Sequence, residues 1–119
     1  MERARPPADI SPRDFFTSWI GDAVDDDPDR RRSLGDTEAT IVFDLTGPDG
    51  GTFAIRIESQ RVRGREGDSE AADLRVRVDV DTWRDLNAGR IAAPQALLKR
   101  RIKLEGDFLL GLRLHLILG

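Results

Sequence analysis

Residues 93–118 read APQALLKRRIKLEGDFLLGLRLHLIL, and this stretch decides which fold the chain adopts. Its first part predicts a helix that opens at Ala93-Pro94, because proline suits the first turn of a helix. Residues 102–105 then alternate between apolar and charged side chains, which is the period of a strand. The last part, residues 108–118, fits both periods, since its leucines alternate with other residues but also form helical stripes. Pattern alone leaves helix and strand open for this segment.

The preceding sequence predicts the rest of a sheet. Strands are expected at residues 40–45, 53–58, 61–65 and 74–80. The run GPDGG separates the first two and is typical of a turn. The segment 74–80 alternates most cleanly, with a leucine and valines at every second position and charged residues between them. One dry and one wet face indicate a mainly antiparallel sheet.

Two more helices are expected. The first covers residues 12–20, where Ser11 can cap the N-terminus and Gly21 offers a stop. The second begins at Thr82, which we expect to be its N-cap, and ends at Ala88-Gly89.

The remaining segments are expected to be irregular. Residues 22–38, with an acidic cluster and the arginines at 30–32, predict a solvated loop. Residues 1–10 are polar and rich in proline, which predicts a flexible N-terminal segment. The chain would then hold one domain, at residues 11–119.

Composition restricts the class of protein. The chain has 119 residues, which is the usual length of a single domain. It has no cysteine, which excludes disulfides and thiolate chemistry. It shows no apolar run long enough to span a bilayer and no signal-peptide pattern at Met1, so we expect a cytoplasmic protein. The formal net charge is −3, which argues against a nucleic-acid partner. The arginines of 61–65 and 75–77 would lie together on the outer face if their strands are neighbours, where they could bind phosphates; we expect a solvated sheet face instead.

Side chains suited to catalysis are scarce. His115 is the only histidine, so a histidine pair for a metal ion does not exist. The sequence has no phosphate-binding loop, dinucleotide fingerprint or nucleophile elbow. We therefore expect a protein that is not an enzyme, with no cofactor and no metal site.

Residues 73–114 carry a resemblance. The strand DLRVRV at 73–78, the helix TWRDLNAGRI at 82–91, the segment APQALLKRRIKLEGD at 93–107 and the ending FLLGLRL at 108–114 together resemble the sterol carrier protein (type 2) family. The order of strand, two helices, strand and closing segment, with a Gly-Asp joint, carries the resemblance. At the level of strand order it extends back to about Thr40.

The resemblance implies an α/β (α+β) fold, with a five-stranded, mainly antiparallel sheet covered by helices around an apolar tunnel. It also implies that residues 108–118 form a helix, which is physically sensible because a helix apolar all round can face a sheet on one side and a cavity on the other. The implied function is non-catalytic binding, and in some members transfer, of a sterol, fatty acyl chain or other lipid.

In such a domain the tunnel walls would come from apolar residues of the C-terminal half. For each of them plain core packing is the alternative, and Phe15, Phe16 and Trp19 would cover the tunnel or touch a membrane unless they are core. The candidate ligand-binding residues are Trp83, Leu86, Ile91, Leu97, Leu98, Phe108, Leu109, Leu112 and Leu116.

The expected partner is a lipid or another apolar small molecule, and transient membrane contact and a homodimer remain open. The alternative function is a non-catalytic interaction or dimerisation module that keeps the fold with a closed pocket. A filled interior and an exposed apolar patch would favour that alternative.

Overall fold

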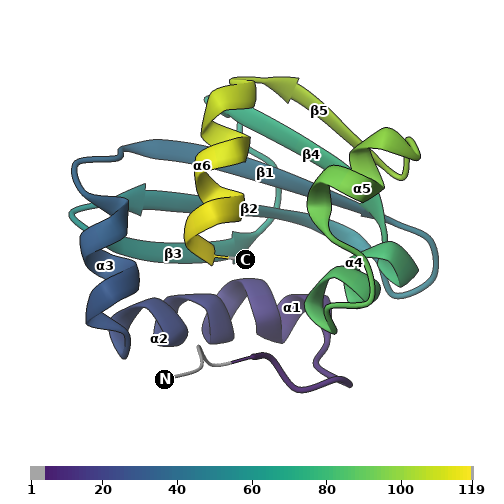
Figure 1. Ribbon diagram of the computed structural model, residues 1–119, viewed down its shortest axis with the longest axis horizontal. Coiled ribbons are helices and arrows are strands. Elements are labelled where there is room, and N and C mark those ends of the chain that lie inside the picture. Colours follow the sequence, from purple (N-terminus) through teal and green to yellow (C-terminus); the bar gives the residue numbers. More distant parts are fainter. Residues whose placement is uncertain (1–4, 119) are drawn as a thin grey trace.

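The computed structural model describes residues 5–118, with side chains up to residue 114. A helical N-terminal region is followed by three strands in hairpin connection, then a strand, two helices, a strand and a closing helix (Figure 1). The elements are α1 (Pro12–Asp14), the π-helical segment η1 (Phe15–Trp19), α2 (Ile20–Asp25), α3 (Pro28–Leu34), β1 (Ala39–Thr46), β2 (Gly51–Glu58), β3 (Arg61–Glu66), β4 (Leu74–Asp79), α4 (Val80–Asn87), α5 (Ala93–Leu98), β5 (Ile102–Gly106) and α6 (Phe108–Leu118).

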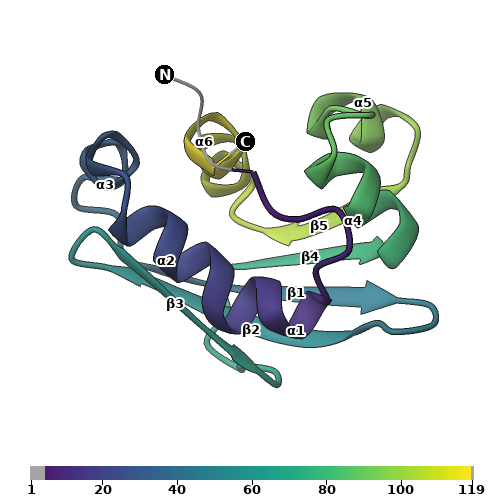
Figure 2. The same ribbon diagram turned by 90° about the horizontal axis from the view of Figure 1, so that it is seen from below.

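The five strands form one sheet in the order β3-β2-β1-β4-β5. Three of the pairings are antiparallel, and β4 runs parallel to β1 because the chain returns from the β3 edge to the opposite side of β1. The helices lie on a single face of this sheet (Figure 2). The five-stranded α/β fold expected from the sequence is therefore confirmed, with a mixed sheet.

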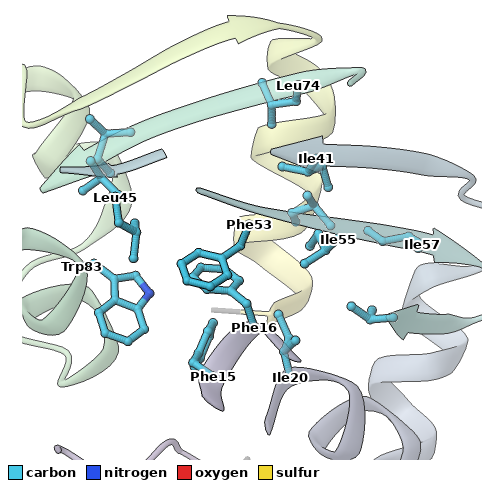
Figure 3. Close-up of a cluster of buried hydrophobic side chains, with 14 of the residues drawn as sticks. Phe15, Phe16, Ile20, Ile41, Leu45, Phe53, Ile55, Ile57, Leu74 and Trp83 are labelled. Carbon is cyan, nitrogen blue, oxygen red and sulfur yellow. The ribbon is translucent and has the colours of Figure 1, made fainter. Parts of the chain in front are cut away.

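An aromatic cluster forms the centre of the core between the sheet and the N-terminal helix (Figure 3). The ring centroid of Phe16 lies 4.8 Å from that of Phe43 and 5.0 Å from that of Phe53, so this side chain joins the helix to two strands. Phe15 meets Trp83 of α4 edge to face at 5.3 Å. These contacts hold the N-terminal helix over the sheet.

The prediction that the first helix stops at Gly21 is wrong, since α1, η1 and α2 form one continuous helical segment that ends at Asp25. Gly21 instead permits a close approach to the sheet edge, where a Cβ atom would lie 2.9 Å from the Val62 carbonyl oxygen. Gly64 of β3 serves the same contact from the other side, because a Cβ there would lie 1.8 Å from the Phe16 carbonyl oxygen. A glycine that allows close packing and a glycine that ends a helix look alike in the sequence.

The solvated loop expected at residues 22–38 is also wrong, because it contains the end of α2 and all of α3. The Asp27 carboxylate caps α3 by accepting hydrogen bonds from the backbone N–H groups of Asp29 and Arg30, and Pro28 occupies the first turn. Arg30 is 4% exposed rather than solvated. Its Nε lies 3.7 Å from Asp27 Oδ2.

The N-cap of α4 is Asp79, three residues before the predicted Thr82. Asp79 accepts hydrogen bonds from both the backbone N–H and the hydroxyl of Thr82, at 2.9 and 2.6 Å. Burial opposes ionisation of the Asp79 carboxyl, but the hydrogen bonds from Thr82 outweigh it and lower the pKa overall. The strand thus passes directly into the helix without a loop.

Replacing Asp79 with alanine should lower the free energy of unfolding by about 1–2 kcal/mol at neutral pH, since two donors of Thr82 lose their acceptor. Because folding lowers the Asp79 pKa, this stabilisation is present above the ordinary value of 3.8 and is lost as the pH falls through the folded-state pKa. Urea unfolding of wild type and Asp79→Ala should show a difference that shrinks in acid. Asp79→Asn keeps a hydrogen-bond acceptor, so its free energy of unfolding should fall between those of wild type and Asp79→Ala. An equal loss of unfolding free energy in both variants would contradict the capping role.

Residues 108–118 form helix α6, as the resemblance implied. Gly106 ends β5 with a φ of 106°, and the Asp107 carboxylate accepts a hydrogen bond from the backbone N–H of Leu110 at 3.1 Å. Leu110 and Leu114 are buried in the core. One side of this helix therefore packs on the core.

The arginines of β3 and β4 do not meet, since β2 and β1 lie between these strands. Much of their charge is matched locally. Arg61 binds Asp25, and Arg75 binds Asp68 and lies 3.7 Å from Asp44. The single arginine surface considered from the sequence is therefore divided.

Candidate ligand-binding cavity

A cavity of about 930 Å³ lies between the helix-covered face of the sheet and the helices. This volume is within the range of sites that enclose small molecules. The sheet contributes inward-facing side chains from four strands, since alternate residues of a strand point to the same face. They are Ile41 and Phe43 of β1, Ile55 of β2, Leu74 and Val76 of β4, and Ile102 and Leu104 of β5.

One wall of the cavity is aromatic. Phe15, Phe16 and Trp19 of the N-terminal helix line it together with Trp83 of α4. Phe15 and Trp19 stack at 5.3 Å, and both phenylalanines are buried in the core. These aromatic residues therefore serve at once as core and as cavity wall, so neither phenylalanine is available at the surface.

The helices of the C-terminal half supply the remaining wall. Of the residues singled out from the sequence, six line the cavity: Trp83, Leu86, Ile91, Leu97, Phe108 and Leu112. Leu98 and Leu109 do not, and they are 86% and 74% exposed. Leu116 lies outside the described side chains.

The rotation of α6 explains why Leu109 misses the cavity. Leu110 and Leu114 face the core, and Gly111 and Leu112 border the cavity, so Leu109 points away from both. Leu98 is the last residue of α5, a helix in which Ala96 is the buried residue. The sequence shows the apolar residues but not the direction in which each one points.

Sequence reasoning missed the polar part of the lining. Arg5 of the N-terminal segment, Arg30 of α3 and Asn87 of α4 line the cavity, and none of the described lining residues is acidic. The N-terminal segment is held beside the cavity, because Arg84 donates hydrogen bonds to the carbonyl oxygens of Ala8 and Ile10 at 3.2 and 3.0 Å. The sequence analysis did not place Arg30 here, because it predicted a loop where α3 lies.

Residues of α5 and α6 form part of the cavity rim. Leu97 of α5 and Phe108 and Leu112 of α6 all line it and are each at least 40% exposed. A side chain that borders a cavity and also contacts solvent marks its rim. Figure 1 shows the two helices standing apart on the same face of the sheet.

A single sheet, helices on one face and an apolar cavity between them define a class of α/β domains with an internal binding space. Within this class the chain belongs to the SCP-2 sterol transfer family, whose model matches residues 20–119. The family resemblance seen in the sequence is thus confirmed.

Among the described residues, every helix is too short or too polar to span a bilayer.

The relatives include much larger proteins. Human hydroxysteroid dehydrogenase-like protein 2 is 25% identical over 84 residues, which cover 70% of this chain and 20% of that protein. A double mutant of the sec-alkyl sulfatase PisA1 is similar in structure with a TM-score of 0.71 and 20% identity, over 92% of this chain and 17% of that one. The chain therefore spans about a fifth or less of these two relatives.

A small relative shares the fold as well. The palmitated SCP2L2 protein from Aedes aegypti matches with a TM-score of 0.57 and 16% identity. The match covers 67% of this chain and 71% of that one. At this identity the likeness shows the fold.

Proposed function

We propose that the chain binds a lipid in the cavity between α5, α6 and the sheet, and releases it chemically unchanged. The volume and apolar lining of this cavity carry the proposal. Each methylene transferred from water into an apolar site gains about 0.8 kcal/mol, so a long acyl chain supplies ample binding free energy against the cost of association. Membership in a sterol transfer family supports the same function.

The polar lining favours a ligand with an anionic head group, such as a fatty acid. The charged residues among the described lining are Arg5 and Arg30, both cations, and Asn87 adds a neutral hydrogen-bonding group. Arg30 is buried, so water screens its charge less than it would at the surface, and the Asp27 carboxylate 3.7 Å from its Nε offsets part of that charge. The palmitated form of the Aedes aegypti protein supports an acyl ligand. A sterol, which carries a neutral hydroxyl, would gain less from these cations.

Arg30→Met should weaken binding of a fatty acid more than binding of the fatty alcohol of equal length. Methionine keeps a long side chain in the wall but removes the charge, and a hydrogen bond to a charged group contributes about 1.5–3 kcal/mol. Titration calorimetry with both ligands would measure the difference, and thermal melting would check that the variant folds. Equal losses for both ligands would contradict the role of Arg30 in binding the head group.

Binding itself is tested by titrating the protein with a fluorescent long-chain fatty acid. We expect saturable uptake at one site, displaced by palmitate, and a co-purified lipid in native mass spectra of fresh protein. Absence of saturable uptake of both fatty acid and sterol probes would overturn the proposed function.

The second candidate is an interaction or dimerisation module. The exposed leucines of α5 and α6 favour it, whereas the open cavity argues against a closed pocket. Analytical ultracentrifugation separates the two functions: a stable dimer that takes up no lipid would support the interaction module.

The cytoplasmic location expected from the sequence stays a prediction.

A further inference from the structure

The N-terminal segment, residues 5–10, lies against the cavity before the first helix begins. Arg5 and Pro6 line the cavity. In Figure 2 the segment is dark purple and crosses in front of the space between α4 and α6. Both helices also contribute to the cavity lining, with Leu86 of α4 and Leu112 of α6 among the residues. The segment is therefore part of the cavity boundary, and we call residues 5–10 the strap.

Arg84 of α4 holds the strap in place. Its Nη1 atom donates hydrogen bonds to the carbonyl oxygens of Ala8 and Ile10, at 3.2 and 3.0 Å. Within the described residues no other hydrogen bond joins the strap to another element, and Arg84 makes no salt bridge. The guanidinium carbon of Arg84 also lies 5.4 Å from the ring centroid of Trp83. The position of the strap therefore depends on one side chain.

The strap itself is weakly packed. Ile10 is half-buried against the core and Pro6 is half-buried, whereas the other strap residues are exposed. A segment with few buried apolar contacts opens locally at a much lower free energy cost than the core. The consecutive prolines Pro6 and Pro7 restrict the backbone and so limit the entropy gained on opening. Local opening of the strap would uncover this part of the cavity while the sheet and helices stay folded.

We propose that the strap is a gate over this side of the cavity, and that Arg84 is the positioning residue that holds it closed. A ligand enters and leaves while the strap is open, and closure shields the bound ligand from water. The gating of a ligand rests on the proposed lipid binding, whereas the fastening of the strap by Arg84 does not. The strap precedes residue 20, where the match to the family begins, so the family match does not supply this feature.

Arg84→Met tests the gate through the rates of ligand binding. Stopped-flow measurements would use a fluorescent long-chain fatty alcohol, whose neutral head group leaves the charge of Arg5 out of the comparison. The association and dissociation rate constants should both rise at least about tenfold, because hydrogen bonds from a charged donor are lost. Kd should stay within about twofold of wild type, since a gate that opens alike for entry and release changes both rates by the same factor. Simple damage to the cavity would raise the dissociation rate constant and Kd without faster association.

A second variant is needed because Arg84→Met also removes the contact with Trp83 in the cavity wall. Pro7→Gly loosens the strap through backbone entropy alone, since Pro7 is exposed and does not line the cavity. It should raise both rate constants about two- to fivefold. The matched control is Arg77→Met, which makes the same chemical change at an exposed position of β4 outside the cavity lining and should leave both rate constants as in wild type.

A spin label reports on the strap without any ligand. The chain has no cysteine, so Asp9→Cys takes a single nitroxide at an exposed strap position. Its electron paramagnetic resonance spectrum should show restricted motion when Arg84 is present and faster motion with Arg84→Met. Equal motion in both proteins would contradict the fastening by Arg84.

The remaining outcomes separate the gate from the proposed function. A label released by Arg84→Met with unchanged rate constants would mean that the ligand passes elsewhere along the rim, and this would overturn the gate. If the wild type binds neither fatty acid nor fatty alcohol, the proposed function fails and the gate fails with it. The fastening role of Arg84 would then still be decided by the spin label.

Discussion

Replacing Val76 with tryptophan is expected to abolish measurable uptake of a long-chain fatty acid while leaving the protein folded. Val76 lies on β4, points to the inner face and lines the cavity. The indole would occupy space that the cavity already provides, so it costs little in packing but removes room for the ligand. Excluding even two methylenes costs about 1.6 kcal/mol, which is more than tenfold in Kd.

The matched control is Arg77→Trp, one residue along the same strand. Successive residues of a strand point to opposite faces, and Arg77 is exposed on the outer face. This variant should bind the fluorescent fatty acid as wild type does. If Val76→Trp binds unchanged while circular dichroism shows a native fold, the cavity is not the binding site.

Gly64→Ala is expected to destabilise the fold by about 3 kcal/mol or more, since overpacking of this severity cannot be relieved by a side chain alone. The new Cβ would lie 1.8 Å from the Phe16 carbonyl oxygen and 2.8 Å from its carbonyl carbon, and both are backbone atoms. The N-terminal helix would have to move away from β3. Phe16, which packs on Phe43 and Phe53, would move with it.

Gly111→Ala is the matched control, because it makes the same chemical change in a place with room. A Cβ at Gly111 would meet only the ends of Leu74 and Leu104, at 3.4 and 3.6 Å. Alanine is the better helix former, so this variant should be more stable than wild type by about 0.5–1 kcal/mol. Urea unfolding measures both variants, and a Gly64→Ala protein as stable as wild type would contradict the close contact between helix and strand.

The starts of the first helix and of α3 show how much of the fold local sequence signals can predict. Ser11 and Pro12 start the first helix as predicted, and Ser11 accepts the hydrogen bond of the Asp14 N–H. The same signal recurs at Asp27-Pro28 and starts α3, although it stands in a charged stretch that predicted a loop. Capping chemistry was therefore readable at both sites, whereas net polarity was a poor guide at the second.

The sequence by itself determined the strands, the family and the apolar character of residues 108–118, because periodicity and motif spacing are properties of neighbouring residues. Only the tertiary structure decided which apolar side chains border the cavity. Leu97 and Leu98 are adjacent and identical, yet one lines the cavity and the other lies in water. Their difference arises because burial depends on segments distant along the chain, here the sheet and α6, and no local pattern encodes where those segments come to lie.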